Sequence, residues 1–133
     1  MTNRVTSVQA LQLRRLGYRG TGHEKIIVGK NARGRYINVP VPTVDEAIDW
    51  IRSKYDVIIY NAFEPYVDPV KIAEKKRSRI MYGMKVKYCD TTNGWNFRQA
   101  VGKTAVTPNI YSAKREAITV ALKYINRNSL RKR

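Results

Sequence analysis

A β-hairpin pattern followed by an amphipathic helix pattern occurs twice in the sequence, and this order restricts the possible folds more than any other feature. The first hairpin is predicted at residues 24–41, where EKIIVGK and RYINVPV are separated by NARG. The second is predicted at residues 82–90 and 95–102, joined by Asn93-Gly94, a dipeptide that strongly favours a two-residue turn. The sequence therefore predicts an α+β fold of two consecutive antiparallel hairpin-plus-helix units.

Four helices are predicted from capping residues and apolar periodicity. The clearest begins at Thr43, which forms a capping-box pattern with Glu46, and extends to residue 55. Its apolar stripe consists of Val44, Ala47, Ile48, Ile51 and Tyr55. A short helix is predicted at residues 6–16, with Val8, Leu11 and Leu16 on one side, and another at about 69–79 after Asp68-Pro69. The last is predicted from a Ser112 cap to about Asn126, with an apolar set of Ala117, Ile118, Ala121, Leu122 and Ile125.

The second hairpin also predicts which side chains share a face of its sheet. With Asn93-Gly94 as the loop, Thr92 pairs with Trp95, Asp90 with Phe97, Tyr88 with Gln99, and Val86 with Val101. This face is expected to be the apolar one, and the opposite face carries Lys85, Lys87, Cys89, Asn96, Arg98 and Ala100. Residues 56–63 predict a buried strand, and residues 104–108 predict a third strand after a turn at Gly102-Lys103.

The predicted elements divide the chain into two lobes and a tail. Residues 1–68 form the first lobe, with the order α-ββα-β, and residues 69–126 form the second, with the order α-βββ-α. Residues 127–133 are a basic tail. Each lobe carries Glu-Ala-Ile at the start of a helix, at 46–48 and 116–118, although the spacing from hairpin to helix differs.

The charge balance points to a polyanionic partner. The chain of 133 residues has 26 Lys and Arg against 10 Asp and Glu, a formal net charge of +16. Such an excess destabilises the compact state by self-repulsion, whereas solubility alone needs a net charge of only about 2–8. Nucleic acid relieves the repulsion and releases condensed counterions, so the sequence predicts a protein that binds DNA or RNA.

Three groups of basic residues are predicted to contact phosphates. They lie at the tip of the first hairpin, on the polar face of the second sheet, and at the start of the last helix. The residues are Lys30, Arg33, Arg35, Lys85, Lys87, Arg98, Lys114 and Arg115. The end of the helix at 69–79 and the basic tail add further positive charge to the third group.

Aromatic residues offer a second kind of contact with nucleic acid. Some tyrosines lie near turns or strand ends, where they either pack in the sheet and core or stack on unpaired bases: Tyr18, Tyr36, Tyr60, Tyr66, Tyr82 and Tyr111. Packing is the favoured interpretation. Trp95 is expected in the core, and Trp50 is either a second packing contact of its helix or an exposed aromatic at a partner site.

The order α-βββ-α in residues 69–126 resembles the layout of double-stranded-RNA-binding domains. In that family, lysines near the start of the last helix bind phosphates across a groove, and the segment Ala113-Lys114-Arg115-Glu116-Ala117 is loosely similar. The Gly-rich third-strand signature of the family is missing, and the similarity covers under half of the chain. The same layout also suits small DNA-binding units whose three-stranded sheet enters the major groove.

The sequence contains no recognisable catalytic, metal or cofactor pattern. It has one histidine, His23, one cysteine, Cys89, and scattered acids, so neither a zinc site nor a catalytic triad is expected. The glycine-rich stretch at residues 17–22 precedes a strand, unlike a nucleotide-binding loop, although it could approach a phosphate backbone. The predicted function is therefore non-catalytic.

The expected compartment is the cytoplasm or the nucleoid. A single cysteine indicates a reducing environment, and the sequence has neither an apolar run of about 20 residues nor a secretory signal pattern. Two alternatives to simple nucleic-acid binding remain open. One is a phage or mobile-element effector that inhibits an acidic host protein in the host cytoplasm, and the other is a component of a ribonucleoprotein assembly.

Overall fold

The computed structural model describes residues 3–20, 25–30, 32–61, 66–67, 80–90 and 97–132. The elements in chain order are α1 (Ser7–Arg15), β1 (Lys25–Lys30), β2 (Tyr36–Pro40), α2 (Val44–Tyr55), β3 (Val57–Asn61), β4 (Tyr66–Val67), β5 (Ile80–Met81), β6 (Met84–Asp90), β7 (Phe97–Lys103) and α4 (Ile110–Arg127). This is an α+β fold, which confirms the predicted class. The helix predicted at 69–79 and the Asn93-Gly94 turn lie outside the described residues.

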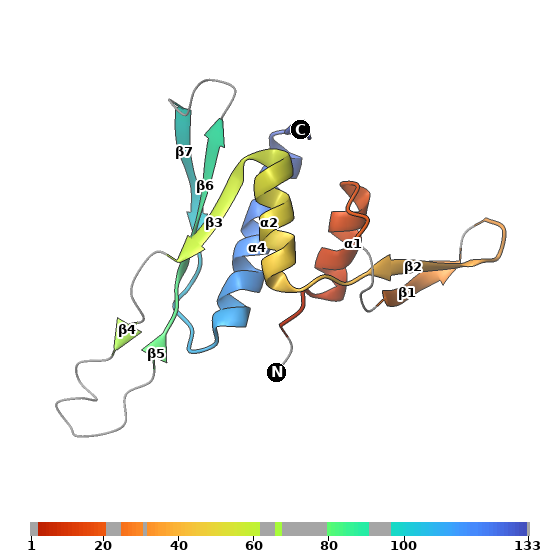
Figure 1. The fold of residues 1–133 in the computed structure, drawn as a ribbon, viewed down its shortest axis with the longest axis horizontal. Helices are drawn as coiled ribbons and strands as arrows, with labels where there is room; N and C mark the ends of the chain where they lie inside the picture. The colour runs from red at the N-terminus through yellow and green to blue at the C-terminus, as the bar shows by residue number, and fades with distance from the viewer. Residues whose placement is uncertain are drawn as a thin grey trace.

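Strands β3, β6 and β7 form an antiparallel sheet with β6 in the middle (Figure 1). The third strand of this sheet is therefore β3, and residues 104–108 are not the strand that the sequence predicts. The chain does not turn back at Gly102-Lys103 but continues beside the start of β6. There the Thr104 N–H donates to the Met84 carbonyl at 2.9 Å, and Thr107 forms an isolated bridge with Tyr82.

The β6–β7 register agrees with the prediction at one end and shifts at the other. Tyr88 pairs with Gln99 and Lys87 with Ala100, which continues the predicted pairing. Val86 then pairs with Gly102 instead of Val101. The prediction was wrong from this point because β7 contains a bulge, in which one extra residue is inserted into a strand and shifts the pairing.

Strand β3 lies at an edge of the sheet and is buried on one side only. Val57 and Ile59 are buried, while Ile58 and Tyr60 are half-buried on the opposite face. The sequence predicted a buried strand because all four residues are apolar or aromatic. The helices that the structure describes cover one face of this sheet, so the strand alternates between buried and partly exposed side chains.

Helices α2 and α4 cover that face of the sheet, and α1 packs beyond them (Figure 1). The hydrophobic core lies between these layers and includes Leu13 from α1, Ile51 from α2 and Val86 from β6. The predicted apolar set of α4 is confirmed, because Ala117, Ile118, Ala121, Leu122 and Ile125 are all buried. The core therefore joins residues from both sides of position 68, where the sequence predicts a boundary between lobes.

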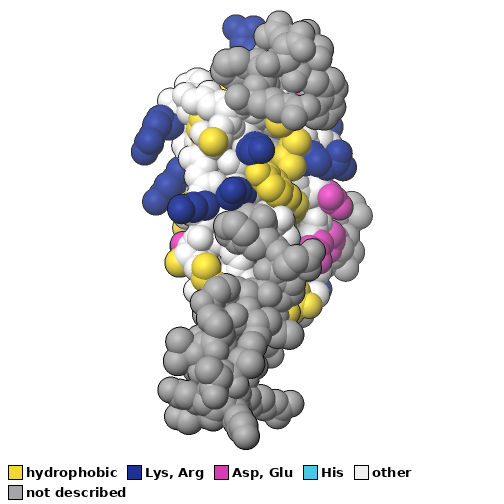
Figure 2. Space-filling model, turned by 90° about the vertical axis from the view of Figure 1, so that its left-hand side faces the viewer, with side chains coloured by type: hydrophobic (Ala, Val, Ile, Leu, Met, Phe, Trp, Pro, Cys, Tyr) yellow, Lys and Arg dark blue, Asp and Glu magenta, His cyan; other side chains and the backbone are white. Residues whose placement is uncertain are grey.

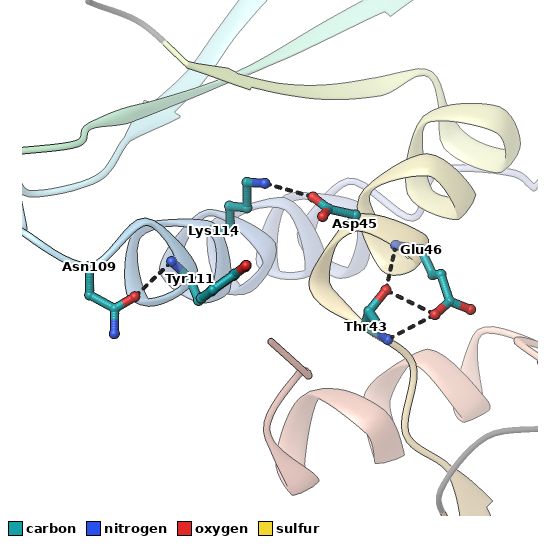
Figure 3. A network of polar contacts seen from close by, with 6 residues as sticks. All are labelled: Thr43, Asp45, Glu46, Asn109, Tyr111 and Lys114. Carbon is teal, nitrogen blue, oxygen red and sulfur yellow. Dashed lines mark hydrogen bonds and ion pairs between the residues drawn. The ribbon is translucent and has the colours of Figure 1, made fainter. Parts of the chain in front are cut away.

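The capping box predicted for α2 is present (Figure 3). The Thr43 hydroxyl accepts a hydrogen bond from the Glu46 N–H at 3.2 Å, and the Thr43 N–H donates to the Glu46 carboxylate at 3.3 Å. The helix ends at Asp56, which adopts the left-handed conformation with φ 58°. Local sequence signals therefore set both the existence and the start of α2.

Helix α4 begins earlier than the sequence predicts. Asn109 caps it, since its side-chain oxygen accepts from the Tyr111 N–H at 2.9 Å (Figure 3). The same oxygen accepts from the Ser112 N–H at 3.4 Å. Ser112 is therefore inside the first turn and is not the cap. Asn and Ser are both good N-cap residues, so the sequence alone did not distinguish between them.

Helix α1 was predicted in the right place, but its predicted apolar side is only partly confirmed. Thr6 caps the helix. Leu11 and Leu16 pack against the core, whereas Val8 is 67% exposed and the fully buried apolar residues are Ala10 and Leu13. The polar Gln9 is also buried, because its side-chain amide donates to the Arg115 carbonyl and to the Thr119 hydroxyl of α4. A buried polar side chain with such partners orients α1 against α4.

Trp50 is a packing contact. Its ring lies perpendicular to that of Tyr18, with 5.5 Å between the ring centroids, and Tyr55 contacts it from another side. Burial, together with the nearby Glu46 carboxylate, raises the pKa of the Tyr18 hydroxyl above its usual value. Gly20 belongs to the same cluster, since a Cβ atom there would lie 2.6 Å from ring carbons of Tyr18. This glycine therefore permits close packing against Tyr18.

The hairpin of β1 and β2 projects from the side of the helices opposite the three-stranded sheet (Figure 1). Its strands pair in an antiparallel register, as predicted, with Lys25 opposite Pro40 and Lys30 opposite Tyr36. Val39 at its base is buried in the core. The hairpin is thus anchored at its base, while its turn lies away from the rest of the fold.

The first residues of the predicted basic tail turn back onto the fold. Leu130 N–H donates to the Ile125 carbonyl at 3.1 Å, and Ser129 N–H donates to the Asn126 carbonyl at 3.4 Å, which together form a Schellman motif. Ser129 adopts the left-handed conformation with φ 48°. Lys132 then lies beside the end of α1, where its ammonium donates to the Leu16 carbonyl at 3.4 Å.

Replacing Ser129 by glycine is expected to stabilise the protein by about 0.5–1 kcal/mol. The left-handed conformation costs an L-residue about 1–2 kcal/mol, and glycine avoids this cost. Glycine also loses more conformational entropy on folding, which offsets about 0.5–1 kcal/mol of the stabilisation. Urea denaturation followed by circular dichroism measures the difference. Ser129→Ala, which keeps the conformational cost, is the control, and a glycine variant no more stable than this control contradicts the prediction.

Candidate nucleic-acid interface

The face of the three-stranded sheet that points away from the helices carries a cluster of lysines. Alternation along the strands places Lys85 and Lys87 of β6 on this outer face, together with Tyr60 of β3, which pairs with Lys85. Lys103 of β7 pairs with Lys85 from the other side. Figure 2 looks onto this side of the molecule and shows Lys and Arg side chains beside a patch of hydrophobic ones, with Asp and Glu side chains along one side of the patch.

A hollow of about 270 Å³ opens on this face between β3, β6 and β7. Its lining is mostly apolar and consists of Tyr60, Lys85, Val86, Lys87, Ala100, Gly102 and Lys103. The bulge in β7 contributes to the hollow, because it brings the small residues Ala100 and Gly102 opposite Lys87 and Val86. The outer face thus combines an apolar floor with three lysines.

The electrostatics of the outer face favour an anion. Lys85 and Lys103 are paired across β6 and β7, which places two cationic side chains on neighbouring strands. The Lys87 ammonium lies 5.4 Å from the centre of the Tyr60 ring, a cation–π arrangement. The three strands contain a single acid, Asp90, at the end of β6. Three ammonium groups on one face attract the phosphates of a polyanion.

The structure places the other predicted contact residues elsewhere. Lys114 is only 19% exposed, and its ammonium lies 2.7 Å from the Asp45 carboxylate at the start of α2 (Figure 3). The Arg115 guanidinium donates to the Arg4 carbonyl at 3.2 Å. Both side chains therefore make intramolecular contacts at the helix ends.

The hairpin tip does not share a surface with the sheet lysines. Arg33 and Arg35 are exposed in the turn between β1 and β2, and Lys30 ends β1. This hairpin and the three-stranded sheet lie at opposite sides of the molecule (Figure 1). Arg98 lies in β7 opposite Cys89, in the same sheet as Lys85 and Lys87.

Sequence reasoning missed Lys103 as a member of the site. It assigned Gly102-Lys103 to a turn, whereas the bulge keeps Lys103 in β7 and aligns it with Lys85. Glycine inside a strand pattern often marks a bulge, so Gly102 was the signal that could have revealed the shift. Tyr60 was recognised only as one of several tyrosines near strand ends.

The structure offers little to support other kinds of site. Among the described residues, no three His, Cys, Asp or Glu side chains are grouped so that they could hold a metal ion. His23 and Asp68 lie outside that part of the chain. No helix within the described ranges is long and apolar enough to cross a membrane. Comparisons with protein-family models, curated proteins and solved structures give no match to this chain.

Proposed function

We propose that this protein binds nucleic acid without chemical turnover, and that the outer face of the three-stranded sheet is its main contact surface. The observation that carries the proposal is the grouping of Lys85, Lys87 and Lys103 on one face of the sheet, with Lys85 and Lys103 paired across the strands. Three ammonium groups this close together attract the phosphates of a polyanion.

The remaining charge of the chain supports the same proposal. A net charge of +16 attracts a polyanion over distances comparable to the Debye length, which is about 10 Å at 0.1 M salt. Arg33 and Arg35 on the projecting hairpin provide a second basic surface on the opposite side of the fold. The protein is then a cytoplasmic or nucleoid component whose affinity comes mainly from phosphates.

The salt dependence of binding tests this proposal. With three phosphate contacts on a single strand, the logarithm of affinity falls with a slope of about −2 against the logarithm of salt concentration. Raising potassium chloride from 50 to 200 mM, measured by fluorescence anisotropy with labelled DNA and RNA, should therefore weaken binding about 20-fold. Absence of binding to every DNA and RNA at 50 mM salt contradicts the proposal, and selective binding to an acidic protein would then favour the effector alternative.

A further inference from the structure

We propose that the hollow beside Tyr60 receives an unpaired nucleobase, so that the outer face of the sheet prefers single-stranded to double-stranded nucleic acid. This inference rests on the proposed function and names its substrate class. It joins two features that phosphate binding alone leaves without a role: the apolar floor of the hollow and the aromatic ring at its side.

The size and lining of the hollow suit one small planar group. Its volume of about 270 Å³ lies below the range of about 300–1,000 Å³ that is typical of pockets for drug-sized ligands. Val86, Ala100 and Gly102 contribute no charged atoms to the lining. A nucleobase is a planar group that gains from contact with such a surface, whereas a phosphate needs the lysines around it.

Tyr60 provides the stacking surface. Its ring is half-buried in the sheet and lies beside the Lys87 ammonium, 5.4 Å from the ring centre. A cation–π contact at an exposed site is weaker than the stacking of a base on an aromatic ring. A bound nucleotide can therefore take the place of the ammonium at the ring, while Lys87 moves to the neighbouring phosphate and keeps a favourable partner.

The arrangement of the lysines fits the backbone of the same strand. Lys85 and Lys87 are two residues apart on β6, a separation of about 7 Å along a strand, and Lys103 lies across from Lys85. The hollow is thus bordered by positive charge on both β6 and β7. A base in the hollow leaves the phosphates on either side of it within reach of these ammonium groups.

A duplex cannot use the hollow in this way. Its bases are paired and stacked on each other, so it presents phosphates and groove edges to a protein. The three lysines still attract the duplex, but the apolar floor and the Tyr60 ring gain no partner. Binding of a duplex is therefore expected to be weaker and to be independent of Tyr60.

The test compares three probes of equal length: a single-stranded oligothymidylate, a duplex, and a single strand of abasic sites that keeps its phosphates. Anisotropy at 100 mM salt should show the oligothymidylate bound at least 5-fold more tightly than the other two. Tyr60→Ala should weaken its binding 5- to 50-fold without changing the other two affinities, because base–aromatic stacking is lost. Tyr60→Phe, which keeps the stacking face, should retain binding within about 2-fold.

A second variant keeps the proposal testable if Tyr60→Ala fails to fold. Ala100→Leu fills the hollow without changing charge and should weaken oligothymidylate binding at least 5-fold, whereas Ala105→Leu, at an exposed position after β7, should not. Equal affinity for single strand, duplex and abasic strand overturns the inference but leaves the proposed function intact. Failure to bind any of the three probes overturns both.

Discussion

Replacing Lys85, Lys87 and Lys103 together by alanine is expected to weaken the binding of a single-stranded oligonucleotide about 100-fold at 0.1 M salt. Each phosphate contact on a single strand contributes about −0.7 to the slope of the logarithm of affinity against the logarithm of salt concentration. Three contacts therefore increase the affinity about 100-fold when salt falls from 1 M to 0.1 M. The slope of affinity against salt should fall by about 2 in the same variant. Anisotropy titrations at four salt concentrations measure both quantities.

A second triple variant with the same net charge distinguishes the effect of losing the site from the effect of losing positive charge. Arg52→Ala, Lys123→Ala and Arg127→Ala remove three exposed cations from α2 and α4, so both triple variants carry a net charge of +13, three below +16. The helix variant should lose less than about 5-fold in affinity, since its charges act only through the long-range field. Equal losses in the two triple variants contradict the assignment of the outer face as the contact surface.

The sheet variant is also expected to fold, because none of the three lysines belongs to the hydrophobic core. A loss of binding therefore cannot be attributed to unfolding if the circular dichroism spectrum and the urea midpoint are unchanged. This expectation distinguishes residues that serve a ligand from residues that serve the fold.

The sequence was sufficient where a few neighbouring residues determine the structure. Thr43 and Glu46 satisfy the first-turn N–H groups of α2 by themselves, so the helix start followed from a four-residue pattern. The apolar side of α4 followed from its periodicity, because a long helix repeats its core contacts every three or four residues. Helix α1 is shorter, and its periodicity did not reveal that Leu13 rather than Val8 is buried.

The candidate site depends on contacts between distant parts of the chain, and these were not predictable. Tyr60 reaches Lys85 only because β3 pairs with β6, and no local pattern specifies that pairing. The ion pair between Lys114 and Asp45 joins residues 69 positions apart, and it involves a lysine that the sequence assigns to phosphate binding. Lys103 entered the site through a bulge beside Gly102, where a Cβ atom would lie 3.0 Å from the Val120 side chain of α4.

Helix α4 supports the sheet that carries the lysines, and Ile118→Ala is expected to show how much stability its packing provides. Ile118 is fully buried in the core, and α4 contacts α1, α2 and all three strands of the sheet. Truncation of a buried isoleucine removes apolar contact and leaves a cavity, at a cost of about 3–4 kcal/mol. This is a large part of the about 5–15 kcal/mol that stabilises a typical domain. Urea denaturation, followed by circular dichroism and by the fluorescence of Trp50 in its aromatic cluster, measures the loss.

Val8→Ala is the matched control, because it also removes methyl groups from an apolar helical side chain but at a position that is 67% exposed. Its free energy of unfolding should change by less than about 0.5 kcal/mol, with alanine favoured slightly by its helix propensity. Since α4 forms the inner support of β6 and β7, Ile118→Ala should also lower the temperature at which oligonucleotide binding is lost. A cost below about 1 kcal/mol would mean that α4 is not the centre of the core, and that the sheet holds its lysines in place without it.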